Sequence, residues 1–116
     1  MVTLNFKSSG IEIDLEGLEK IAAMKGKLFI PYDHITNVEE NADSVKRYLK
    51  AGGTALGYSH DLFGRFTTND GLGFFVVRDM KKAFAIHLTD EAYKVIVLQL
   101  HDNANAVAEL RKRIKK

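Results

Sequence analysis

The sequence predicts a mainly β protein, built from short strands and closed by one C-terminal α-helix. Three observations support this fold class. Apolar and polar residues alternate over several short stretches, which is the period of a half-buried strand. Turn-forming residues separate these stretches at close intervals. After residue 101 the apolar residues recur at three- and four-residue steps instead, which is typical of a helix.

Two stretches near the N-terminus, residues 2–6 and 11–15, alternate on either side of Ser-Ser-Gly at residues 8–10. Serine and glycine favour turns, so this pattern predicts a β-hairpin. Residues 16–24 have the spacing of either a short helix or a turn.

The next part of the chain is less regular. Residues 27–30 predict a strand, and Pro31 is confined to a sheet edge or a bend because proline has no N–H to donate. Another strand is expected at residues 35–39. Residues 41–62 form a long connection with a candidate short helix at residues 42–49, and connections of this length are usually functional or mobile.

A regular strand pattern returns at residues 63–67 and is followed by Asn-Asp-Gly at residues 69–71, a strong turn signal. The continuous apolar run at residues 74–77 predicts a strand that is buried on both faces. Residues 84–88 and 93–100 predict two further strands.

The C-terminal helix is expected to begin at Asp102 or Asn103, because both residue types cap helices well. Glu109 and Arg113 lie one helical turn apart and should form an ion pair. The apolar stripe that should face the strands consists of Ala104, Val107, Leu110 and Ile114.

Length and composition indicate one ordinary globular domain over residues 1–116. The chain is 46% hydrophobic and 28% charged, and it contains no cysteine. Disulfides, thiolate metal sites and a cysteine nucleophile are therefore excluded. No apolar run approaches the about 20 residues that span a bilayer, and the N-terminus alternates rather than resembling a signal peptide. We expect a cytoplasmic protein that is at most peripheral to a membrane.

The formal net charge of +2 comes from the C-terminal tail. Residues 111–116 carry five positive charges, so the rest of the chain is net acidic. A nucleic-acid-binding surface normally spreads over one face of a fold, and we expect no nucleic-acid partner. We interpret residues 111–116 as the frayed, solvated end of the helix.

The chain resembles bacterial pleckstrin-homology-like (PH-like) domains in the order of its strands and helix and in several core and turn segments. These segments are Gly17–Ile21, Ile30–Tyr32 with Ile35, Gly53–Thr54, Gly64–Phe66, Phe74–Asp79, Lys82–Ala83, Ile86–Leu88 and Tyr93. The resemblance implies a strongly bent antiparallel β-barrel of about seven strands, capped at one end by the C-terminal helix. It also implies no enzymatic activity and no cofactor, and some such domains form oligomers.

The four histidines, His34, His60, His87 and His101, lack the close spacing of a metal site, and no metal is expected. His87 is predicted to be a surface or hydrogen-bonded histidine. His60 and Asp61 lie in the irregular segment and form the one acid–base couple that we consider for catalysis. Neighbouring residues point to opposite faces of a strand, so a small hydrolase centred on this couple is the least favoured function.

The candidate residues for binding a ligand or a partner are Lys46, Arg47, Lys50, Thr54, His60 and Arg65. The favoured hypothesis is a non-enzymatic module that contacts a protein partner or a second copy through residues 41–62 and nearby exposed strand edges. The alternative is an anionic-ligand or phospholipid-surface binder that uses the basic residues and the tail, with weak membrane contact. The first hairpin has Lys7 as its one cation, which argues against a phosphoinositide site there.

Overall fold

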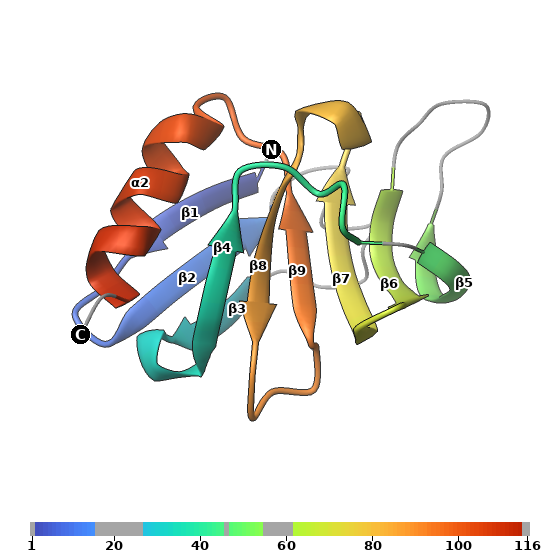
Figure 1. Cartoon of the computed structure of the whole chain (residues 1–116), viewed down its shortest axis with the longest axis horizontal. Coiled ribbons are helices and arrows are strands. Elements are labelled where there is room, and N and C mark those ends of the chain that lie inside the picture. Colours follow the sequence, from blue (N-terminus) through green and yellow to red (C-terminus); the bar gives the residue numbers. More distant parts are fainter. Residues whose placement is uncertain (1, 16–26, 46, 55–61, 115–116) are drawn as a thin grey trace.

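The computed structural model describes residues 2–15, 27–45, 47–54 and 62–114, with the backbone alone for residues 47–54, 62 and 63. Strands come first and a helix comes last, as expected (Figure 1). The elements are β1 (Val2–Phe6), β2 (Gly10–Leu15), β3 (Lys27–Pro31), η1 (Tyr32–His34), β4 (Ile35–Glu39), β5 (Arg47–Thr54), β6 (Leu62–Thr68), β7 (Gly71–Val77), η2 (Met80–Lys82), β8 (Phe84–Leu88), β9 (Val95–Leu98) and α2 (Asn103–Ile114). The mainly β prediction is confirmed for these residues.

The first three strands form an antiparallel sheet in the order β1-β2-β3. The predicted hairpin joins β1 and β2, and the Lys7 amide donates a hydrogen bond to the Gly10 carbonyl at 2.9 Å to close it. Pro31 ends β3, which is the outer strand of this sheet on the side away from β1. The expected position of this proline at a sheet edge is therefore confirmed.

The other described strands form a second sheet in the order β4-β8-β9-β7-β6-β5. Strands β7 and β9 are parallel, whereas the remaining neighbours are antiparallel. The expectation of wholly antiparallel strands is wrong at this pair. All four residues of β9, Val95–Leu98, are buried, and such a continuous apolar strand requires an interior position with both faces covered. The place between β8 and β7 provides that position.

Residues 47–54 form β5, and the short helix predicted at residues 42–49 is wrong there. The strand pairs with β6 from Arg47, opposite Thr68, to Thr54, opposite Phe63, with two register shifts. Pairing along this length satisfies the backbone, and such tertiary context outweighs a weak local helical pattern. With β5 included, the described residues contain nine strands rather than about seven.

Two apolar clusters lie on opposite faces of the second sheet. The larger cluster lies between the two sheets and α2, and includes Ile11 of β2, Phe74 of β7 and Leu110 of α2. The smaller cluster contains Phe75 and Val77, which confirms that the run at residues 74–77 is buried on both faces. Among the described strands no ladder joins the two sheets, which meet across the larger cluster (Figure 1).

The helix α2 begins after Asp102, whose Oδ1 accepts a hydrogen bond from the Asn105 amide at 3.0 Å. The predicted cap at Asp102 is confirmed. The predicted stripe is correct for Val107, Leu110 and Ile114, but Ala104 is exposed and Ala106 is buried in its place. The reason lies in Asn103, which accepts from the Leu100 amide and donates to the Lys82 carbonyl, and so fixes the rotation of the first turn. In the described residues, no helix is long and apolar enough to cross a membrane.

Candidate functional site

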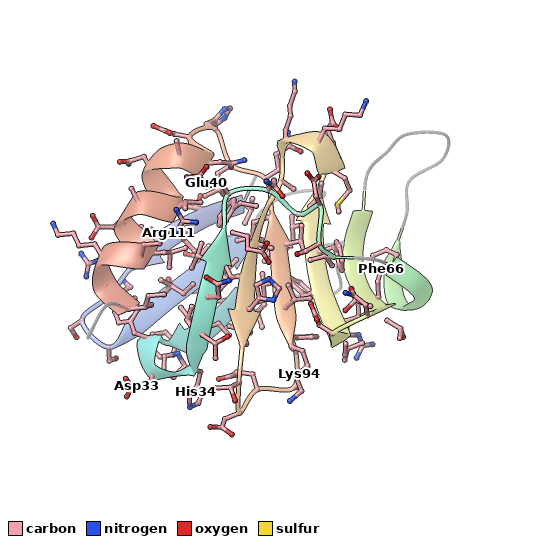
Figure 2. All side chains as sticks on the ribbon, in the orientation of Figure 1. Asp33, His34, Glu40, Phe66, Lys94 and Arg111 are labelled. Carbon is pink, nitrogen blue, oxygen red and sulfur yellow. The ribbon has the colours of Figure 1, made fainter. Side chains whose placement is uncertain are left out.

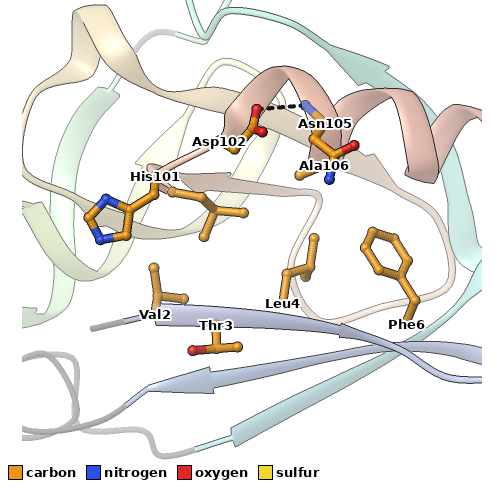
Figure 3. A pocket seen from close by; sticks show the side chains of 9 residues that line it. Val2, Thr3, Leu4, Phe6, His101, Asp102, Asn105 and Ala106 are labelled. Atoms are coloured by element: carbon orange, nitrogen blue, oxygen red, sulfur yellow. Dashed lines mark hydrogen bonds between the residues drawn. The ribbon is translucent and has the colours of Figure 1, made fainter.

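A groove between β1 and the first turns of α2 is the candidate functional site (Figure 3). It encloses about 290 Å³, which is near the lower end of the volumes of small-ligand sites. Its lining consists of Val2, Thr3, Leu4, Phe6, Leu100, His101, Asp102, Asn105 and Ala106. Apolar side chains from β1 form the floor, and polar groups at the N-terminal end of α2 form one rim (Figure 3).

The alternation of β1 places its apolar side chains on the side of the helix. Val2, Leu4 and Phe6 belong to or pack against the larger apolar cluster, which includes residues of α2. Thr3 is exposed, and Asn5 donates from Nδ2 to Asp14 Oδ2 of the neighbouring strand at 2.8 Å. Because side chains alternate along a strand, the same period that buries one face of β1 leaves Thr3 and Asn5 on the other.

The outer edge of β1 carries backbone groups that point away from β2. The bond between Lys7 and Gly10 sets the phase of the ladder. Hydrogen-bonded and non-hydrogen-bonded pairs alternate in an antiparallel ladder, so Thr3 and Asn5 bond to β2. Val2, Leu4 and Phe6 therefore direct their N–H and C=O groups outward, and among the described residues β1 pairs with β2 alone.

The other three sheet edges carry features that oppose further pairing. Strand β3 ends in Pro31 and begins with Lys27, and β5 contains Arg47 and Lys50 together with two register shifts. Prolines, lysines and bulges are the usual means by which proteins protect sheet edges. Strand β1 has no charged residue, proline or register shift over residues 2–6.

The edge of β4 is covered by an arginine from α2. Arg111 donates from Nε and Nη2 to the Val38 carbonyl at 3.2 and 2.8 Å, and from Nη1 to Glu40 Oε1 at 3.3 Å. Figure 2 shows Arg111 between the helix and this strand. The guanidinium therefore uses the hydrogen-bonding capacity of an outward carbonyl with which an added strand would have to pair. Within the described ranges, β1 differs from these edges: it has no proline, charged residue or register shift, and Arg113 of α2 contacts it at the Phe6 ring rather than at an outward carbonyl.

Arg113 ties the end of α2 to the first hairpin. Its guanidinium lies 5.2 Å from the centre of the Phe6 ring and 5.9 Å from that of Tyr32. It also bonds to Glu109 at 2.6 Å, which confirms the predicted ion pair, and this bond raises the pKa of Arg113. Residues 111–114 belong to the helix, so the prediction of a frayed end is wrong for them, whereas Arg111 and Arg113 are exposed as predicted. Both nevertheless have partners on the strands and the first hairpin: the Val38 carbonyl for Arg111, and the Phe6 ring and the Lys7 carbonyl for Arg113.

Most binding residues predicted from the sequence lie where side chains are not described. Lys46, His60 and Asp61 fall outside the described residues, and so does most of the 55–62 segment. The backbones of Arg47, Lys50 and Thr54 lie in β5, and Arg65 is exposed on the adjacent strand β6, opposite Gly52. The backbone pairing therefore puts the residues Arg47, Lys50 and Arg65 on neighbouring strands.

A polar network that the sequence did not predict lies over the smaller apolar cluster. His87 contacts Glu39 through Nε2, and its Nδ1 lies 3.6 Å from Asp70 Oδ2. The Ser44 hydroxyl donates to Glu39 Oε1 at 2.9 Å, and the Ser44 carbonyl accepts from Asn69 Nδ2 at 3.1 Å. This network confirms that His87 is hydrogen-bonded, and its serine hydroxyl bonds to the carboxylate rather than to the imidazole.

Glu39 makes the stability that this network contributes depend on pH. The hydrogen bond from Ser44 is the largest effect on the pKa of Glu39 and, with the contact to His87, lowers it despite partial burial. A lowered pKa in the folded state means that the ionised carboxylate stabilises the fold above its ordinary pKa. This stabilisation is lost as the pH falls through the lowered value.

We expect Glu39→Gln to reduce the free energy of unfolding by less than about 1 kcal/mol at pH 7, because the carboxylate is partly exposed. The difference from the wild type should shrink as the pH falls through the lowered pKa of Glu39, and vanish at an acid pH where the carboxylate is fully protonated. Urea unfolding at both pH values measures this. Glu40→Gln is the matched control, since Glu40 is 74% exposed in its side chain and lies outside the network. If Glu39→Gln and Glu40→Gln reduced the free energy of unfolding equally at pH 7, the stabilising role assigned to Glu39 would be contradicted.

Within the part of the chain that the structure describes, no cluster of three His, Asp or Glu side chains is arranged to hold a metal ion. No protein-family model matches the chain, and neither a curated protein nor a solved structure is significantly similar to it.

Proposed function

We propose that this protein is a non-enzymatic protein-binding or self-assembly module, and that the outer edge of β1 with the adjoining groove is its contact surface. The observation that carries the proposal is the contrast between sheet edges. Three described edges have an arginine on an outward carbonyl, a proline, lysines or register shifts, whereas β1 has none of these and meets Arg113 at the Phe6 ring. Extended segments of partner proteins commonly bind by adding a strand to such an edge, with neighbouring pockets selecting their side chains.

Two measurements on the full chain test the proposal. Size-exclusion chromatography with light scattering should give a mass above that of the 13.0 kDa chain, rising with concentration, if the protein assembles with itself. Selection from a displayed peptide library should enrich extended peptides with alternating apolar residues if it binds other proteins. A monomer at every concentration that also enriches no peptide would refute the proposal.

We propose the resemblance to PH-like domains from the order of the elements along the chain and from the apolar core that α2 shares with both sheets. A three-stranded antiparallel sheet comes first, and α2 comes last and packs with both sheets in the larger apolar cluster. The parallel pair β7 and β9 departs from the wholly antiparallel pattern that the resemblance implies. A PH-like barrel predicts strongly bent sheets with α2 capping one open end.

Binding of an anionic ligand or an anionic phospholipid surface is a second candidate function. It is supported by the pairing of β5, which carries Arg47 and Lys50, with β6, which carries the exposed Arg65. Co-sedimentation with phosphatidylserine vesicles at low and high salt tests it, because electrostatic binding weakens with salt. No pelleting at low salt would exclude this function.

A further inference from the structure

We infer that two copies of this chain associate through antiparallel pairing of β1 with β1, centred on Leu4, so that the two three-stranded sheets become one continuous sheet. The inference rests on the proposed function and specifies its partner as a second copy. Three features of the molecule support it: the hydrogen-bonding phase of β1, the charge along the strand, and the groove beside it.

The hydrogen-bonding phase selects one register. Val2, Leu4 and Phe6 direct their backbone groups outward, because the bond between Lys7 and Gly10 fixes the ladder between β1 and β2. Each outward residue must face an outward residue of the other copy. Pairing Leu4 with Leu4 is the register that uses all three, since Val2 then faces Phe6 of the second copy and Phe6 faces Val2.

The charges along β1 suit pairing with itself. Residues 2–6 are uncharged, so no like charges oppose each other across the strands, an arrangement that would be unfavourable. The two ends of the strand differ in sign. Exposed Lys7 follows β1, whereas exposed Asp102 lines the groove beside Val2 at the opposite end. An antiparallel pair brings the basic end of each copy to the acidic end of the other, twice by symmetry.

The groove lies beside the position that Phe6 of the second copy would take. Val2, Leu100 and Ala106 are among the apolar residues that line the groove. In the register centred on Leu4, Phe6 of the second copy lies across from Val2 and therefore beside the groove. Two paired β1 strands and two grooves form a small interface, and interfaces below the standard size of about 1,600 Å² are usually weak. We expect the dimer to dissociate on dilution.

Amide hydrogen exchange followed by NMR tests the register directly. The amides of Thr3 and Asn5 bond to β2 in either state and should be protected at all protein concentrations. Those of Leu4 and Phe6 should be unprotected in dilute protein and become protected as concentration rises. If the mass increases with concentration while Leu4 and Phe6 remain unprotected, the register is refuted but the proposed self-assembly stands. A monomer at every concentration refutes both.

Two variants of one residue isolate the backbone contact. Leu4→Pro removes the central outward N–H without removing a hydrogen bond to β2, whereas Leu4→Ala removes the same side chain and keeps the N–H. We expect the dimer dissociation constant of Leu4→Pro to exceed that of Leu4→Ala by about tenfold or more, because both bonds of the central pair are lost. Equal constants would overturn the inference.

A charge variant provides an independent test if Leu4→Pro does not fold. Thr3 is exposed, and in the inferred register Thr3 of each copy is the diagonal neighbour of Thr3 of the other. Thr3→Lys should therefore weaken the dimer, and more so at low salt. The control is Thr67→Lys, which places the same charge at an exposed position of the interior strand β6 and should leave the dimer unchanged. If Thr67→Lys weakens the dimer more than Thr3→Lys does, the inference is refuted.

Discussion

Leu110→Ala is expected to lower the free energy of unfolding by about 2–5 kcal/mol, which is the range for a fully buried leucine. Leu110 has no exposed surface, and it joins α2 to residues of both sheets in the larger apolar cluster. Alanine at this position loses the buried surface and leaves a cavity where the two sheets and the helix meet. Urea unfolding at low protein concentration measures the loss without the added stability of association.

Two variants on the same helix control this prediction. Lys112 is exposed, and Lys112→Ala should change the stability by no more than about 0.5 kcal/mol. Ile114 is half-buried against the same cluster, and Ile114→Ala should give an intermediate loss. If Ile114→Ala costs more than Leu110→Ala, the helix is rotated relative to the packing described above.

Local patterns were sufficient to predict the strands whose side chains alternate. The hairpin of β1 and β2 and the doubly buried run of β7 follow from the sequence, because side-chain alternation and turn chemistry depend on neighbouring residues alone. The parallel pairing of β7 with β9 depends on which strand lies beside which. Strand β5 was missed for the same reason, since its stability comes from β6 rather than from its own residues.

The helix shows how one distant contact can change a local prediction. Periodicity identified Val107 and Leu110 correctly, but it could not separate Ala104 from Ala106 in the first turn. The hydrogen bond from Asn103 to the Lys82 carbonyl decides between them, and the two residues lie far apart in the sequence. Similarly, the sequence predicts Arg111 as part of a solvated tail, whereas in the structure its guanidinium donates a hydrogen bond to the Val38 carbonyl.

The candidate site was predicted only in part. Residues 2–6 were recognised as a strand, but whether a strand is an edge depends on the whole sheet. One signal was present in the sequence: this strand lacks the charges and prolines that edge strands usually carry. The sequence prediction placed the binding site at the basic residues of the 41–62 segment instead, because a cluster of cations can be recognised without knowing how the strands pair.

Gly10→Ala is expected to be the second severe substitution, with a loss of about 1–3 kcal/mol from overpacking. A methyl group at Gly10 would overlap the Ile30 carbonyl oxygen and lie 2.8 Å from the Pro31 Cα. Both are backbone atoms of β3, the strand that pairs with β2 at this point, and they can move only if the strands separate. The smaller gain from restricting the unfolded chain, about 0.4–1 kcal/mol, does not offset this clash.

The position of the damage distinguishes this clash from a general loss of stability. Gly10→Ala should reduce amide-exchange protection in β2 and β3, where the strands are forced apart, and leave β7 and β9 protected until global unfolding. Ser9→Ala, at the adjacent exposed turn residue, is the control and should be nearly neutral. If Gly10→Ala matched this control in stability and exchange, then β3 could not lie against Gly10 as described. Because β2 also holds the inner side of β1, the same variant should weaken the strand edge through which we infer that two copies associate.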